Sequence, residues 1–88
     1  MGKSQIAYLE LDVMKPHLPS LPEFSMLIHN VEGVKKVQAN LLEIDRYTEN
    51  IKLIIYSENI EYERLRECIS ENNGIIHSID RVIVEKKL

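Results

Sequence analysis

Apolar residues recur along the chain at two different spacings. Residues 5–15 and 34–44 alternate between apolar and polar side chains, which is the period of a strand with one buried face. Residues 51–57 (IKLIIYS) are apolar on both parities, and residues 74–86 (GIIHSIDRVIVEK) are apolar except for a polar group near their start. The pattern predicts four strands, the second and third joined as a hairpin through the polar segment DRYTEN.

A helix is predicted between the first two strands. Before it, the segment KPHLPSLPEF holds three prolines and indicates a rigid turn. Ser20 followed by Glu23 is a capping box, and Pro22 is tolerated because first-turn amides lack intrahelical partners. Apolar residues at helical spacing then predict a helix over about residues 21–31, with Gly33 as its terminator.

A second helix is predicted between the third and fourth strands. Asn59 is placed to cap it, and the Asn73-Gly74 pair is placed to end it through a left-handed residue. Leu65 and Cys68 belong to its buried stripe, so Cys68 is interpreted as a small buried thiol with a raised pKa and not as a nucleophile.

This order of elements predicts one α+β domain over residues 1–88, a ferredoxin-like βαββαβ sandwich. Right-handed crossovers give an antiparallel sheet in the order 4-1-3-2 with both helices on one face. We expect strands one and four to be antiparallel neighbours. We also expect strand three to run parallel to strand one, which would place its end and both helix N-termini at one edge.

Composition narrows the class of partner. The chain has 14 acidic and 11 basic residues, a net charge of −3, and therefore lacks the positive field that holds a nucleic-acid backbone. Its single cysteine cannot form an internal disulfide, and no apolar run approaches the roughly 20 residues of a membrane span. The first residues do not have the layout of a secretory signal. We expect a cytoplasmic protein without nucleic-acid or membrane partners.

Polar residues near the start of the fourth strand suggest a site. Pairing of strands one and four would bring them close to polar residues at the end of the first strand. The candidate ligand-binding residues are Asp12, Lys15, His17, His77, Ser78 and Asp80. Two imidazoles, an ammonium group and helix N-termini could together hold a small anion such as a carboxylate or phosphate.

Two other interpretations of these residues stay open. Glu10, Asp12 and Asp80 could supply oxygen ligands to a divalent cation such as calcium. Alternatively, the residues form a polar clasp, in which His77 donates to Asp80 or Asp12 and His17 fixes the proline-rich turn.

The remaining polar residues favour surface roles. Glu43, Asp45 and Glu49 at the predicted hairpin tip are interpreted as a solvated turn, with a weak calcium site at a subunit junction as the alternative. His29 is expected on the solvent side of the first helix. No Gly-rich phosphate loop or Ser-His-Asp arrangement is present, so an enzyme is not the favoured class.

Self-assembly follows from apolar residues that one layer of helices cannot cover. The second face of the sheet would expose a set contributed by three strands, namely Ile6, Tyr8, Leu42, Ile44, Ile54 and Tyr56. A solvated antiparallel face is expected to be polar, so we expect another copy to cover it. The predicted assembly is a homo-oligomer larger than a dimer.

Three stretches, LDVMKPHLPS, EGVKKV and NNGIIHSIDRVIVEK, together resemble an archaeal ferredoxin-like family, domain-of-unknown-function family 211. The resemblance covers nearly the whole chain, and Lys15-Pro16-His17 and His77-Ser78 with Asp80 are its specific parts. It implies ring-like homo-oligomers and no established chemistry.

These observations favour a homo-oligomeric binding or regulatory module that holds a small ligand or ion. The alternatives are an enzyme with a His77/Asp80 acid-base pair and a structural assembly factor with a protein partner.

Overall fold

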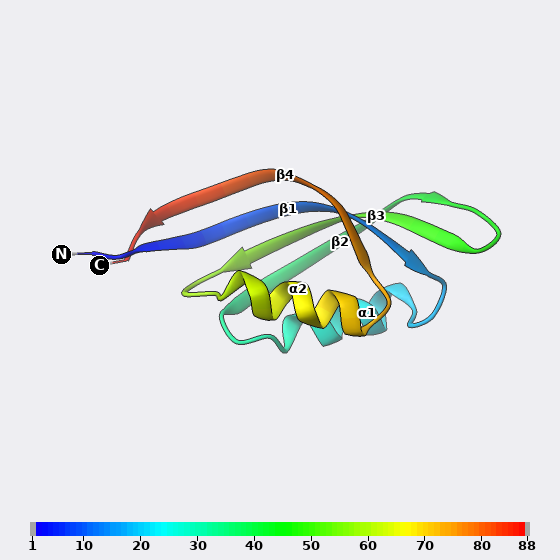
Figure 1. The fold of residues 1–88 in the computed structure, drawn as a ribbon, viewed down its shortest axis with the longest axis horizontal. Coiled ribbons are helices and arrows are strands. Elements are labelled where there is room, and N and C mark those ends of the chain that lie inside the picture. The colour runs from blue at the N-terminus through cyan, green and yellow to red at the C-terminus, as the bar shows by residue number, and fades with distance from the viewer. Residues whose placement is uncertain (1, 88) are drawn as a thin grey trace.

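The strands and helices follow one another in the predicted order. A computed structural model describes residues 2–87. Its elements are β1 (Ser4–Pro16), α1 (Leu21–His29), β2 (Val34–Ile44), β3 (Thr48–Ser57), α2 (Tyr62–Glu71) and β4 (Ile75–Lys86). The sheet order is β2-β3-β1-β4, every neighbouring pair is antiparallel, and both helices lie on one face (Figure 1). The structure therefore confirms the ferredoxin-like fold. No helix within residues 2–87 is long and apolar enough to span a membrane.

The direction of β3 relative to β1 differs from the prediction. β3 is antiparallel to β1, with Tyr8 opposite Tyr56 and Pro16 opposite Thr48. The crossover through α1 keeps β2 parallel to β1, and the hairpin then reverses the chain. The end of β3 therefore lies beside the start of β1, and the N-termini of the two helices lie at opposite ends of the sheet. The prediction of a shared edge was wrong.

The helix boundaries are set partly as predicted. Ser20 caps α1, since its hydroxyl oxygen accepts a hydrogen bond from the Glu23 amide at 3.4 Å. Asn59 does not cap α2, because it adopts a left-handed φ of 59° and the helix begins only after Glu61. Gly33 lies beyond the end of α1 in the turn that leads into β2.

The core lies between the helices and one face of the two central strands. Its buried side chains are Leu9, Leu11 and Val13 of β1, Ile51, Leu53 and Ile55 of β3, Phe24 and Ile28 of α1, and Leu65 and Ile69 of α2. The buried positions recur every second residue on each strand and every three to four residues on each helix, as the apolar pattern of the sequence predicts.

A β-bulge occurs where the apolar parity of β4 changes. Glu10 faces Arg81 and Leu11 faces Ile79, so Asp80 is the extra residue. The change of apolar parity at Asp80-Arg81, which is visible in the sequence, is thus the mark of this bulge.

The sheet extends beyond the helices at both ends, and the molecule measures 50 × 21 × 17 Å (Figure 1). We call the end of the β2–β3 pair the hairpin arm, whose exposed apolar residues are Leu41, Leu42, Ile44 and Tyr47. We call the end formed by β4 with the start of β1 the terminal arm, whose exposed apolar residues are Ile79, Val82, Ile83 and Val84. Eight of the thirteen large apolar residues exposed within residues 2–87 lie on these two arms, and the others include Leu18, Met26 and Ile75.

We call the face of the sheet opposite the helices the open face. Its centre is less apolar than predicted. Ile6 packs against the core instead of facing outward, because a register shift between Ile6 and Tyr8 changes the side on which it lies. Tyr8 and Tyr56 cover each other edge to face, with ring centroids 5.3 Å apart, and Ile54 is half-buried. The centre of this face thus covers part of its own apolar surface.

Candidate functional site

The end of β1 contacts the β2–β3 hairpin through Lys15. The Lys15 side chain is 1% exposed, at the end of the buried stripe of β1. Its ammonium donates to the Glu49 carboxylate at 3.1 Å and to the Pro16 carbonyl at 2.8 Å, and lies 5.7 Å from the centroid of the Phe24 ring. Lys15 is therefore a buried cation neutralised by Glu49.

His17 contacts the same carboxylate from the turn that follows β1. Its Nδ1 lies 2.9 Å from the second Glu49 oxygen, and its Nε2 lies 3.0 Å from the Arg46 carbonyl oxygen. The hydrogen bond with Glu49 raises the pKa of His17 and lowers the pKa of Glu49. His17 thus ties the proline-rich turn to the hairpin, as the clasp interpretation proposed for this residue.

A second polar group lies on the open face of the sheet, where Lys52 of β3 contacts side chains of β1 and β4. The Lys52 ammonium lies 3.2 Å from an Asp80 oxygen and 3.5 Å from a Glu10 oxygen. Ser78 donates to the other Asp80 oxygen at 2.8 Å. The Ser78 and Lys52 hydrogen bonds lower the pKa of Asp80, and the Asp80 hydrogen bond raises the pKa of Lys52.

Strands β1 and β4 meet as predicted, but only some of the candidate residues come together. Asp12 and Ser78 are register partners, whereas Lys15 and His17 contact the hairpin. His77 lies at a register shift and is exposed. Within the described chain the side chains of His77 and Asp12 make no hydrogen bond, so the bond from His77 to Asp80 or Asp12 that the clasp interpretation expected is absent. The six candidate residues form two groups rather than one.

Apart from that of Asp12, the carboxylates of both groups are engaged within the fold. Lys52 lies between Glu10 and Asp80, and the Arg81 guanidinium lies 3.8 Å from the other Glu10 oxygen, so two cations balance the two carboxylates. At the hairpin tip, Asp45 accepts hydrogen bonds from the amides of Tyr47 and Thr48, which lower its pKa. No group of three or more His, Cys, Asp or Glu side chains in residues 2–87 is arranged to hold a metal ion.

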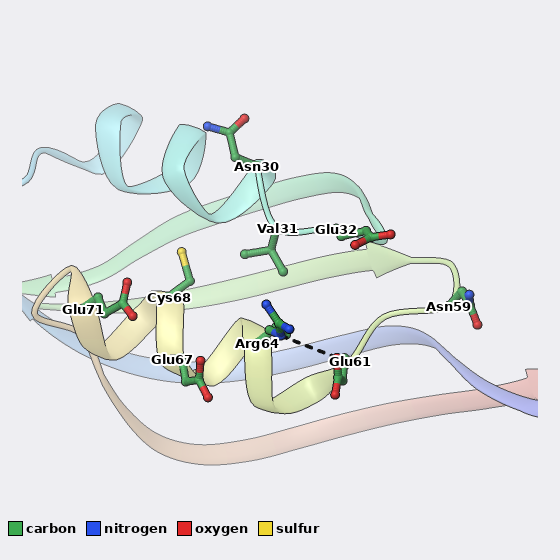
Figure 2. Close-up of a pocket in the computed structure, with 9 residues that line it drawn as sticks. All are labelled: Asn30, Val31, Glu32, Asn59, Glu61, Arg64, Glu67, Cys68 and Glu71. Atoms are coloured by element: carbon green, nitrogen blue, oxygen red, sulfur yellow. Dashed lines mark ion pairs between the residues drawn. The ribbon is translucent and has the colours of Figure 1, made fainter.

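A separate groove of about 450 Å³ lies between the end of α1 and α2 (Figure 2). The residues that line it are Asn30, Val31, Glu32, Asn59, Glu61, Arg64, Glu67, Cys68 and Glu71. Arg64 pairs with Glu61 at 3.6 Å, and the Cys68 thiol donates to the Leu27 carbonyl at 3.6 Å. Burial raises the pKa of Cys68, so the thiol stays protonated and is a poor nucleophile. None of the six candidate residues lines this groove.

Two residues organise these groups, and neither role was predicted: Lys52 was given no role, and the interpretation of Glu49 as part of a solvated turn was wrong, since its side chain is 12% exposed. Lys52 is the single charged residue in IKLIIYS, and Glu49 is the residue of the hairpin that faces the end of β1. Their roles depend on the register between β1 and β3, in which Lys15 lies opposite Glu49 and Asp12 lies opposite Lys52. An antiparallel alignment of these strands would have found both pairs.

The antiparallel order β2-β3-β1-β4 with two helices on one face defines the chain as a small ferredoxin-like α+β domain. The chain belongs to the DUF211 family, described as "Uncharacterized ArCR", whose model matches residues 8–88. It is also similar to an uncharacterised protein of Methanocaldococcus jannaschii, with 34% identity over 83 residues, which cover 94% of this chain and 86% of that protein. The resemblance drawn from the sequence motifs is confirmed.

Proposed function

We propose that the chain is a homo-oligomeric, ring-like binding or regulatory module, in which the hairpin arm of one copy packs against the terminal arm of the next. The observation that carries this proposal is the presence of exposed apolar side chains at both ends of one elongated molecule. Ile44 is 59% exposed on the hairpin arm and Val84 is 56% exposed on the terminal arm. Clustered apolar exposure of this kind marks an interaction surface.

Edge strands support the same contact. β2 and β4 are the two edges of the sheet, and each runs through one of the arms. An edge strand presents backbone donors and acceptors that another chain can pair with. Each arm therefore offers both an apolar surface and an unpaired backbone.

The position of the arms favours a head-to-tail arrangement. Different surfaces at opposite ends of a molecule can meet in successive copies, and such a contact gives a closed ring when its rotation closes. The assembly then contains more than two copies, and every arm is covered.

A ligand site on the assembled open face is the second part of the proposal. The side chains of Asp12 and His77 make no hydrogen bond within the described chain and lie near Ser78 and Asp80, so they are available to a small ion, although no three metal-binding side chains gather there. Calcium and phosphate are the probes to use, and thermal denaturation is the measurement. Stabilisation of the wild type, absent in Asp12→Asn and His77→Ala, is expected because a bound species stabilises only the state that binds it.

An enzyme that uses His77 and Asp80 as an acid-base pair is the alternative, and it has weaker support. The hydrogen bonds to Asp80 lower its pKa and make it a poor general base. Neither residue lines the groove between α1 and α2 or the smaller one between α2 and β4. A structural assembly factor with a protein partner would use the same arms, and it would leave the purified chain monomeric.

Two variants and their mixture test the head-to-tail contact. Ile44→Glu removes the hairpin arm as a docking surface, and Val84→Glu removes the terminal arm. Each variant alone should be monomeric by sedimentation velocity, because every contact would contain one charged arm. An equimolar mixture should form pairs, because one intact hairpin arm can meet one intact terminal arm.

Met26→Glu is the matched control, since Met26 is 70% exposed on α1 and lies outside both arms. It should assemble like the wild type. Association of either arm variant alone, or a mixture that stays monomeric, would contradict the head-to-tail contact.

A further inference from the structure

His17 joins two parts of the chain that are distant in sequence. It lies in the turn between β1 and α1, while its two contacts, Glu49 and Arg46, belong to the β2–β3 hairpin. Both ring nitrogens are within hydrogen-bond distance of an oxygen, at 2.9 Å and 3.0 Å. The histidine is thus a direct link between the turn and the hairpin tip.

The two oxygens differ in origin but have the same hydrogen-bonding role. A backbone carbonyl accepts and cannot donate, and an ionised carboxylate also only accepts. Lys15, whose ammonium lies 3.1 Å from the other Glu49 oxygen, favours the ionised form of Glu49. A neutral imidazole carries one N–H and can satisfy one of these acceptors, whereas an imidazolium carries two and satisfies both.

We propose that His17 is a pH-sensitive switch that fastens the hairpin tip to the β1–α1 turn. In its protonated state the ring donates to both Glu49 and the Arg46 carbonyl. Loss of the proton removes one of the two donors, and the hairpin tip then loses one of its two bonds to the turn.

The charged groups around His17 determine the pH range of this switch. From β3, Glu49 hydrogen-bonds the ring and raises the pKa of His17 above its usual 6.5. In the hairpin turn, Asp45 lies close enough to His17 that the positive charge of the imidazolium contributes to lowering the pKa of Asp45. The Arg46 guanidinium, in the same turn, lies over the Tyr47 ring. From β1, the Lys15 ammonium contacts Glu49 from the side opposite the imidazole.

The direction of the pH effect follows from the two shifted groups. Because folding raises the pKa of His17, its contribution to stability is complete below 6.5 and is lost as the pH rises through the folded pKa. Because folding lowers the pKa of Glu49, its contribution is present above 4.5 and is lost as the pH falls through the folded pKa. Both contacts are therefore complete in mildly acidic solution, and the His17 contact opens first as the pH rises.

The switch acts on the part of the molecule that carries the hairpin arm. Arg46 precedes Tyr47, which is 70% exposed, and follows the exposed Ile44 by two positions. If the arm is the docking surface proposed above, deprotonation of His17 loosens that surface and weakens assembly. This consequence rests on the proposed function, whereas the switch itself does not.

Nuclear magnetic resonance of the arm variant Val84→Glu, which leaves every residue of the hairpin arm unchanged, tests the switch directly. The ¹⁵N resonances of the His17 ring report its protonation state, and the Tyr47 amide ¹⁵N belongs to the same peptide group as the Arg46 carbonyl. Between pH 5 and 9 both signals should change with one common midpoint. Replacing Glu49 with Gln in this background should move that midpoint to lower pH.

Two further variants in the same background complete the test. His17→Gln should abolish the pH dependence of the Tyr47 signal. His29→Gln should preserve it, because His29 contacts one carbonyl only, that of Lys35 at 3.2 Å. A His17 ring that is neutral throughout the range, or a Tyr47 titration that persists in His17→Gln, would overturn the proposal. The ring measurement needs no substitution at Glu49, so it decides the question even where Glu49→Gln fails to fold.

Discussion

At the residue scale, the buried pair of Lys15 and Glu49 places the strongest constraint on the end of β1. The Lys15 side chain is fully buried and the Glu49 side chain is 12% exposed. A buried charge that loses its partner costs far more than an exposed one, whereas a matched apolar pair is often tolerated in its place. Lys15 is therefore a structural cation and not a free ligand for an anion.

Glu49→Ala should lower the free energy of unfolding by about 3 kcal/mol, because the Lys15 ammonium would stay buried with the Pro16 carbonyl as its remaining acceptor. The double variant Lys15→Met/Glu49→Leu should recover most of this loss. Urea denaturation at one protein concentration measures both. The control is Glu63→Ala, whose partner Arg66 is half-exposed, and it should change little. A double variant as unstable as Glu49→Ala would show that the charge itself is not the cause.

His77→Ala separates a structural role from a ligand role for the histidine of β4. Because the His77 ring is exposed and makes no hydrogen bond within the described chain, its removal should change the free energy of unfolding by less than about 0.5 kcal/mol. A loss of about 1–3 kcal/mol would instead reveal a buried partner left unpaired, as the clasp interpretation requires. Chemical denaturation without added ions makes the comparison.

At the element scale, the position of each strand and helix follows from apolar periodicity and turn chemistry. The capping box at Ser20 and the left-handed Asn73 at the end of α2 act as the sequence indicates, with φ of 69° at Asn73. The direction of a strand does not follow from its apolar periodicity, because it depends on whether the preceding connection reverses the chain. Taking β3 as parallel to β1 separated Lys52 from Asp12 and Glu49 from Lys15, so the predicted site left out the residues that β3 contributes.

Gly33 is required by the close approach of two loops and not by the end of α1. Its φ is +93°, and a Cβ atom there would lie 2.9 Å from the Glu58 carbonyl oxygen, a backbone atom that cannot move aside. Gly33→Ala should lower the free energy of unfolding by about 2 kcal/mol. Glu32→Ala, at the exposed neighbouring position, is the control and should have little effect. Equal stability of the two variants would contradict this account of the turn.

At the scale of the whole molecule, the two arms dominate the surface. The apolar pattern of the sequence predicts an excess of apolar residues, and therefore self-association, and places these residues on the open face of the sheet. That assignment assumed unbroken alternation along β1 and full exposure of the β3 residues. The register shift beside Tyr8, the tyrosine pair and the Lys52 ion pairs cover or polarise the centre of that face. Leu42 and Ile44 of the predicted set are exposed, on the hairpin arm, and further exposed apolar side chains lie on the terminal arm.

The mass of the wild-type chain in solution is the most direct test of the proposed assembly. The chain has a mass of 10.3 kDa, and light scattering coupled to size-exclusion chromatography at micromolar concentration measures how many copies associate. Two apolar arms at opposite ends predict one discrete species that contains more than two copies. A single species with the mass of one chain would contradict the account.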